Sequence, residues 1–175
     1  EIRSLRDDIE KKLEILLRNL PDRFKEVIKD IRTSLDSLFT KWPLTLSHED
    51  LTEMNVLINP STGHLTGIVD WNNARIVPFG LGLYGVESFL GTMENNGWKY
   101  YSNVEQIRVT FQELLRTAMA KNLPDLSEAE AHSKLMLAKR LGFLLHYGFV
   151  FGDGDGERPV KEGDRNMMYL EAFLL

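Results

Sequence analysis

The sequence predicts an α+β fold that is mainly helical and contains a small antiparallel β-hairpin. Two observations support this prediction. Apolar residues recur at helical spacing on both sides of residues 44–71, and that middle segment contains short β-prone stretches separated by turn residues. A chain of 175 residues with 43% hydrophobic residues can build one core of ordinary density, so we expect a single domain over residues 1–175.

Two amphipathic helices are expected ahead of the hairpin. The first apolar series runs until Pro21 interrupts it, with Ile2, Leu5, Ile9, Leu13, Leu16, Leu17 and Leu20 at helical spacing. A second series begins at Phe24 and ends before Trp42, with Val27, Ile28, Ile31, Leu35 and Leu38. Because Lys29 lies inside this second period, "VIKDI" predicts a lysine on a helix surface, although it resembles the V-A-I-K motif of kinases.

The hairpin is expected where strand-like and turn-like residues alternate. "LTLSH" and "NVLIN" are short, apolar and β-prone, and "PSTGH" supplies the Pro and Gly of a turn ahead of "LTGIVDW". We expect these stretches to form one small antiparallel sheet. The following segments "ARIVPFGLGLYGVESFLGTM" and "ENNGWKYYSN" predict an irregular middle. In the first of them, "GLGLYG" satisfies G-x-G-x-x-G, but Pro78 disturbs any strand that feeds it, which favours close packing or a helix entry over a nucleotide loop.

Helices are expected again in the last part of the chain. Asn103 can cap an apolar helix that ends before "KNLPDLS". Ser127 and Glu130 form an S-x-x-E capping box ahead of the longest and most buried helix. "GDGDGERPVKEGDR" predicts a solvated loop, and "NMMYLEAFLL" predicts a closing helix.

Composition excludes several classes of function. The formal net charge of -5 leaves no excess of basic side chains to neutralise phosphates, so no nucleic-acid partner is expected. No apolar run approaches the roughly 20 residues that span a bilayer, and "EIRSLRDDIEKK" is no signal peptide, so no membrane partner is expected. The absence of Cys excludes thiolate chemistry and agrees with a cytoplasmic location.

Other candidate sites can also be explained by ordinary structural roles. Asp153, Asp155 and Glu157 resemble a calcium loop, but Arg158 stands where an EF-hand needs Gly, which favours a flexible loop. A core or helix-end role is expected for His146, and neither His64 nor His132 has a metal-ligand partner at a suitable spacing. The aromatic residues Trp98, Tyr100 and Tyr101 either line a substrate cleft or pack against the helices.

One ordered set of polar residues points to phosphoryl transfer. His48, Asp50 and Asn55 fit H-x-D-x-x-x-x-N, the spacing of the kinase catalytic loop, and Asp70 ends the next apolar stretch. Phosphoryl transfer needs a carboxylate that orients and deprotonates the attacking hydroxyl, and oxygen ligands that hold Mg²⁺. Asp50 suits the first role, Asn55 and Asp70 suit the second, and His48 is expected to brace the loop. A merely solvated β-loop is the alternative interpretation.

The strings "LSHEDLTEMNVLI" and "TGIVDW" resemble the aminoglycoside phosphotransferase and choline-kinase-like family, especially its fungal branch. The resemblance runs from about Leu46 to Tyr101. It implies the C-terminal lobe of the protein-kinase-like fold, with the hairpin carrying the catalytic loop. It also implies ATP and Mg as cofactors and a small-molecule hydroxyl as substrate. On this resemblance the catalytic residues are the base Asp50 with His48, the magnesium and nucleotide ligands are Asn55 and Asp70, and Trp71 packs beneath the metal loop.

The sequence also departs from the family pattern. Glu49 stands where the family usually has Gly, and "PFGLGLYG" stands where bacterial members have a further acidic pattern. No glycine-containing strand pair and no strand lysine precede the catalytic loop, so the nucleotide-binding N-terminal lobe is absent and the chain alone is expected to be a weak or inactive kinase. Three explanations follow: a truncated gene, self-association in which another copy completes the missing lobe, or a fold retained for another task. The last would make the chain a non-catalytic binding or interaction module, or a kinase fold repurposed for another small-molecule reaction.

Overall fold

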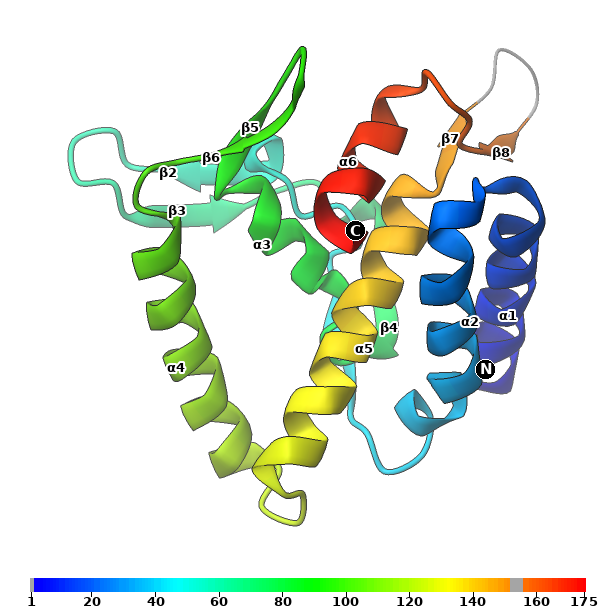
Figure 1. Cartoon of the computed structure of the whole chain (residues 1–175). Coiled ribbons are helices and arrows are strands. Elements are labelled where there is room, and N and C mark those ends of the chain that lie inside the picture. The colour runs from blue at the N-terminus through cyan, green and yellow to red at the C-terminus, as the bar shows by residue number, and fades with distance from the viewer. Residues whose placement is uncertain (1, 152–155) are drawn as a thin grey trace.

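The computed structural model describes residues 2–151 and 156–175. Helices contain 58% of the described residues, which confirms the prediction of a mainly helical α+β structure. The long central helix α5 has α1 and α2 on one side, and α3 with two strand pairs on the other (Figure 1). The helices are α1 (Ile2–Asn19), α2 (Lys25–Ser34), α3 (Tyr84–Ser88), α4 (Val104–Asn122), α5 (Glu128–Tyr147) and α6 (Arg165–Leu174).

Within the described residues, the strands form four separate antiparallel pairs, β1 with β4, β2 with β3, β5 with β6 and β7 with β8. Each of these strands is three or four residues long, so each pair depends on neighbouring helices for stability. The strands are β1 (Leu44–Ser47), β2 (Val56–Ile58), β3 (Leu65–Ile68), β4 (Arg75–Pro78), β5 (Gly91–Glu94), β6 (Gly97–Tyr100), β7 (Phe149–Phe151) and β8 (Glu157–Pro159).

The expected single sheet of "LTLSH", "NVLIN" and "LTGIVDW" is wrong, because β1 pairs with β4 and leaves β2 and β3 as a separate hairpin. Leu44 lies opposite Pro78, and Ser47 lies opposite Arg75. Two further bonds close this pair at its outer end. The indole of Trp42 donates to the carbonyl oxygen of Phe79 at 2.8 Å, and the Phe79 amide donates to Pro43 at the same distance.

The expected irregular middle is also wrong in part, since it contains β4, α3 and the β5–β6 hairpin. In that hairpin Trp98 packs against α6, with ring centroids 5.8 Å from Tyr169 and 5.1 Å from Phe173. Trp98 therefore takes the packing role rather than the cleft role. Tyr100 contacts Arg108, whose guanidinium lies 4.4 Å from the ring centre, and Tyr101 is exposed.

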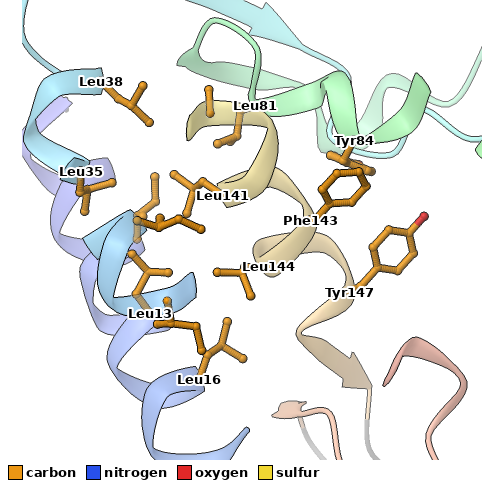
Figure 2. Close-up of a cluster of buried hydrophobic side chains, with 14 of the residues drawn as sticks. Leu13, Leu16, Leu35, Leu38, Leu81, Tyr84, Leu141, Phe143, Leu144 and Tyr147 are labelled. Atoms are coloured by element: carbon orange, nitrogen blue, oxygen red, sulfur yellow. The ribbon is translucent and has the colours of Figure 1, made fainter. Parts of the chain in front are cut away.

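The hydrophobic core lies between α1, α2 and α5. Leu13 and Leu16 from α1 meet Leu141 and Leu144 from α5, and all four side chains are buried (Figure 2). Leu35 and Leu38, in the short 3₁₀ turn after α2, cover the same leucines of α5. Burying a leucine contributes about 1.5–3 kcal/mol, so these contacts hold the N-terminal helices against α5.

The N-terminus of α5 has the predicted capping box. The Ser127 hydroxyl accepts from the Glu130 amide at 3.3 Å, and the Glu130 carboxylate accepts from the Ser127 amide at 3.2 Å. With 20 residues, of which eight are buried, α5 is the long buried helix that the sequence predicted. Within residues 2–151 and 156–175, no helix is long and apolar enough to cross a membrane.

Candidate active site

The candidate residues lie on two neighbouring connections. His48, Asp50 and Asn55 belong to the segment between β1 and β2, called the 48–55 loop below. Asp70 follows β3, which pairs with β2 in antiparallel orientation. Because the start of β2 lies beside the end of β3, with Val56 opposite Ile68, the two connections meet at one end of the hairpin.

His48 links the two connections by a hydrogen bond. Its imidazole Nε2 lies 2.8 Å from the carbonyl oxygen of Val69, the residue before Asp70, and the side chain is buried. The Trp71 ring packs edge-on against the imidazole, with centroids 4.7 Å apart. Since an imidazole N–H that donates to a carbonyl is held in one tautomer and one orientation, this bond ties the 48–55 loop to the Asp70 segment.

Asn55 joins the candidate base to the same segment. Its amide Nδ2 donates to the Asp50 backbone oxygen at 2.8 Å and to the Asp50 carboxylate Oδ2 at 3.2 Å. Its backbone oxygen accepts from the Val69 amide at 3.0 Å. Asn55 is buried, so its side chain has little freedom and fixes the direction of the Asp50 carboxylate.

Asp70 adopts a left-handed backbone conformation with φ of 62° and ψ of 58°. Such a conformation is uncommon outside glycine and is tolerated best by Asp and Asn. One carboxylate oxygen, Oδ1, accepts from the Asn72 amide at 2.9 Å, and the side chain is exposed. Within the described residues, the second carboxylate oxygen has no hydrogen-bond partner, so it is available to a ligand.

The donor set of Asn55 and Asp70 suits a hard cation. An amide oxygen and a carboxylate oxygen are the ligands that Mg²⁺ prefers, and Mg²⁺ keeps several further positions for water or phosphate. The Asn55 Oδ1 atom, like the free oxygen of Asp70, is without a hydrogen bond in the part of the chain that the structure covers. In that same part, no three His, Asp or Glu side chains form a group that could hold a metal ion on their own.

Glu49 replaces the expected glycine and keeps its geometry. Its φ is 62°, in the region that favours glycine. Its side chain is only 12% exposed, and the carboxylate Oε2 accepts from Nε and Nη2 of Arg75 at 3.0 and 2.8 Å. Arg75 therefore neutralises the negative charge that Glu49 places beside Asp50.

The glycine-rich segment of residues 80–85 packs against the end of β1 and against the 48–55 loop. A Cβ at Gly82 would overlap Ser47, and a Cβ at Gly85 would overlap the carbonyl oxygen of Leu51. Between them, the Tyr84 hydroxyl donates to the backbone oxygen of Glu49 at 2.6 Å. The prediction that "GLGLYG" reflects close packing or a helix entry is confirmed, because these glycines let the start of α3 pack directly against Ser47 and Leu51.

Sequence reasoning missed an ion cluster around Glu87, a buried carboxylate of α3. The Glu87 carboxylate accepts from Lys139 at 2.6 Å and from Arg108 at 2.9 Å. Burial alone would raise the pKa of Glu87, but these two cations outweigh it and hold the pKa below its ordinary value. The cluster lies in a cleft of about 850 Å³ between α3, α4 and α5, which contains none of His48, Asp50, Asn55 and Asp70. No local spacing signals it, since its members come from three helices.

The remaining candidates stay apart from this site. Lys29 lies in α2 and pairs with Glu26, so the helical interpretation is confirmed. His64 and His132 are exposed. Asp153 and Asp155 lie outside the described residues, and Glu157 pairs with Lys12 at 2.7 Å.

Comparison with known proteins agrees with part of this assignment. A model of the phosphotransferase enzyme family (APH) matches residues 3–81, slightly less than half of the chain. No curated protein and no solved structure matches. The matched segment contains α1, α2 and the first two strand pairs. Residues 3–81 are thus similar to the phosphotransferase enzyme family, and all four candidate residues lie within them.

Proposed function

We propose that the chain belongs to the aminoglycoside phosphotransferase and choline-kinase-like family and corresponds to the C-terminal lobe of its kinase-like fold, as in the fungal branch. The proposed reaction moves the γ-phosphate of ATP to a hydroxyl of a small molecule. One observation carries the proposal: Asn55 bonds both to Asp50 and, through its backbone, to the segment that ends in Asp70. These bonds join the Asp50 and Asn55 side chains to the connection that carries Asp70, and phosphoryl transfer needs oxygen-bearing side chains of this kind.

In the proposed mechanism, Asp50 accepts the proton of the substrate hydroxyl as that oxygen attacks phosphorus. Asn55 donates to the Asp50 carboxylate and fixes its direction, and His48 holds the two connections together. Asn55 and Asp70 would hold magnesium, which, when bound, neutralises the developing charge on the phosphates. The proton transfer itself requires an unprotonated Asp50 within hydrogen-bond reach of the hydroxyl.

The elements ahead of the 48–55 loop limit the activity of the chain on its own. Residues 2–47 form α1, α2 and β1 with two short 3₁₀ turns, and they contain no paired strands that bear a glycine loop and a lysine. Each missing contact to the phosphates removes several kcal/mol of transition-state stabilisation. We therefore propose that the chain transfers phosphate weakly alone, and that self-association is one way to supply the missing contacts.

The first test is the substitution Asp50→Asn. This variant keeps the shape of the side chain but removes the base, so phosphate transfer from γ-labelled ATP to a panel of small alcohols and amino alcohols should fall about 10²–10⁴-fold. Circular dichroism should show an unchanged fold. Asp125→Asn is the matched control, because Asp125 is exposed on the turn between α4 and α5. Equal turnover in Asp50→Asn and the unaltered protein would refute the role of Asp50 as base.

A second candidate function is a binding module derived from a kinase, without phosphoryl transfer. Glu49 beside Asp50 favours it, because Arg75 bonds to one oxygen of its carboxylate and the other oxygen has no partner within the described residues. A kinase-fold protein that performs another reaction on a small molecule is the third alternative. Titration calorimetry with ATP and Mg²⁺ separates the first two. The enzyme predicts metal-dependent heat that Asp70→Asn reduces, whereas the module predicts no heat from a protein with an intact fold.

A further inference from the structure

We infer that His146 is a positioning residue whose protonation is coupled to the 48–55 loop through Tyr84. His146 is close to the C-terminus of α5, about a hundred residues after the loop in sequence, and no sequence motif connects the two. The inference rests on the proposed function for its effect on catalysis. The coupling itself can be measured without any activity.

The contact runs through stacked rings. The His146 imidazole lies parallel to the Tyr84 ring, with centroids 4.3 Å apart and planes inclined by 25°. The Tyr84 hydroxyl in turn donates to the backbone oxygen of Glu49, the residue before Asp50, at 2.6 Å. A second ring, that of Tyr147, meets the imidazole edge-on at 4.6 Å. His146 is therefore held by rings on two sides. One of them, Tyr84, connects it by a hydrogen bond to the backbone beside Asp50.

Figure 2 shows why this contact forms on one side of α5. The leucines of α5 point toward α1 and α2, whereas Phe143 and Tyr147 point to the opposite side, where Tyr84 lies at the start of α3. Tyr84 is buried, and burial raises the pKa of its hydroxyl, so it remains a donor to Glu49 across the physiological range. Burial raises the pKa of Tyr147 in the same way. Both rings that touch His146 are thus uncharged.

The charged groups near His146 belong to the loop. Burial lowers the pKa of His146, and the negative charges of Asp50 and Glu49 offset part of this effect. Glu49 is paired with Arg75, which weakens its influence, so Asp50 is the main unpaired charge that favours the imidazolium form. The lowered pKa keeps His146 neutral near pH 7.

The effect of a protonated His146 on the loop runs through the Tyr84 ring. A cation stacked on this ring would change the contact by which the Tyr84 hydroxyl supports the Glu49 backbone. We therefore expect the proposed phosphate transfer to lose rate on the acid side as His146 takes up a proton.

The coupling is tested by NMR titration of the His146 ring in the full chain. In Asp50→Asn, the His146 pKa should fall below its value in the unaltered protein, because one offsetting negative charge is gone. Asp125→Asn, which removes an exposed and distant carboxylate, should leave it unchanged. An identical His146 titration in Asp50→Asn and the unaltered protein would overturn the inference, even if the protein proves to be a phosphotransferase.

The effect on the reaction is tested with His146→Phe, which keeps an aromatic ring against Tyr84 but cannot titrate. The pH profile of kcat/KM for the unaltered protein should show a several-fold loss on the acid side that His146→Phe removes, while His132→Phe, at an exposed site of the same helix, keeps it. A purely structural role would lower kcat/KM at every pH without changing the profile, and that result would overturn the positioning role. A shifted NMR titration without phosphate transfer would uphold the coupling and refute only the proposed function.

Discussion

Glu49 and Arg75 show how one residue can depart from a sequence pattern while the local geometry is preserved. A left-handed conformation costs a residue other than glycine about 1–2 kcal/mol. Glu49 adopts it, and its carboxylate is largely buried beside Asp50. The two contacts from Arg75 to a single carboxylate oxygen offset the burial of that charge, although the other oxygen has no partner within the described residues.

This pairing predicts a non-additive pair of substitutions. Arg75→Ala should lower the free energy of unfolding by about 1–3 kcal/mol, because it leaves the Glu49 carboxylate buried without its cation. In the double variant Glu49→Gly with Arg75→Ala, most of this loss should be recovered, since glycine removes both the charge and the strain at φ of 62°. Urea unfolding of the four proteins in the cycle measures the coupling.

The control for this cycle is Arg3→Ala, which removes an exposed arginine of α1 and should change stability by less than about 0.5 kcal/mol. Strictly additive losses in the Glu49 and Arg75 cycle would show that the two side chains do not interact in solution. The bonds between them would then have no part in holding the 48–55 loop.

At the scale of the elements, the helices could be predicted well from the sequence, because the signals that define them are local. Pro21 ends the first apolar period, and α1 ends at Asn19. Ser127 and Glu130 sit three residues apart and form the predicted capping box of α5. Such contacts depend on residues within one or two turns, so they can be read from spacing alone.

The strand pairs were less predictable because their partners are distant in sequence. The hairpin of β2 and β3 has a turn with Pro60 and Gly63, and its existence was predicted. The partner of β1 is β4, about thirty residues later, and "RIVP" has no alternation and ends in Pro78. The pairing is fixed by tertiary contacts around Trp42 and Phe79, which no local pattern reveals.

The candidate site was also only partly predictable from the sequence. His48, Asp50 and Asn55 fall within eight residues, so their spacing could indicate one loop. Tyr84 contacts that loop and His146 stacks on Tyr84 because α3 and α5 pack together, and no local pattern in the sequence connects these residues. The residues that support the site could therefore not be predicted, because they belong to helices that lie far from the loop in sequence.

At the scale of the whole molecule, burial is distributed unevenly among the helices. Eight residues of α5 are buried, but Met119 is the one buried residue of α4. The two helices diverge from their connecting turn in a V (Figure 1), and the cleft of about 850 Å³ lies between them. Apolar side chains of α4 consequently remain in contact with solvent, among them Ile107 at 38% exposed and Leu114 at 67% exposed.

This imbalance predicts that α4 opens independently of the rest of the molecule. Helices of similar length derive most of their stability in a protein from packing rather than from intrinsic propensity, so α4 should open at a lower free energy than α5, by a few kcal/mol. Hydrogen exchange followed by NMR or mass spectrometry should show faster exchange in the middle of α4 than in the middle of α5. Protection in α4 equal to that in α5 would contradict the prediction. If the protection of α4 fell when the protein was diluted, a second copy of the chain would be covering its exposed face. If the protection did not change on dilution, the few contacts around Met119 would be stronger than their burial indicates.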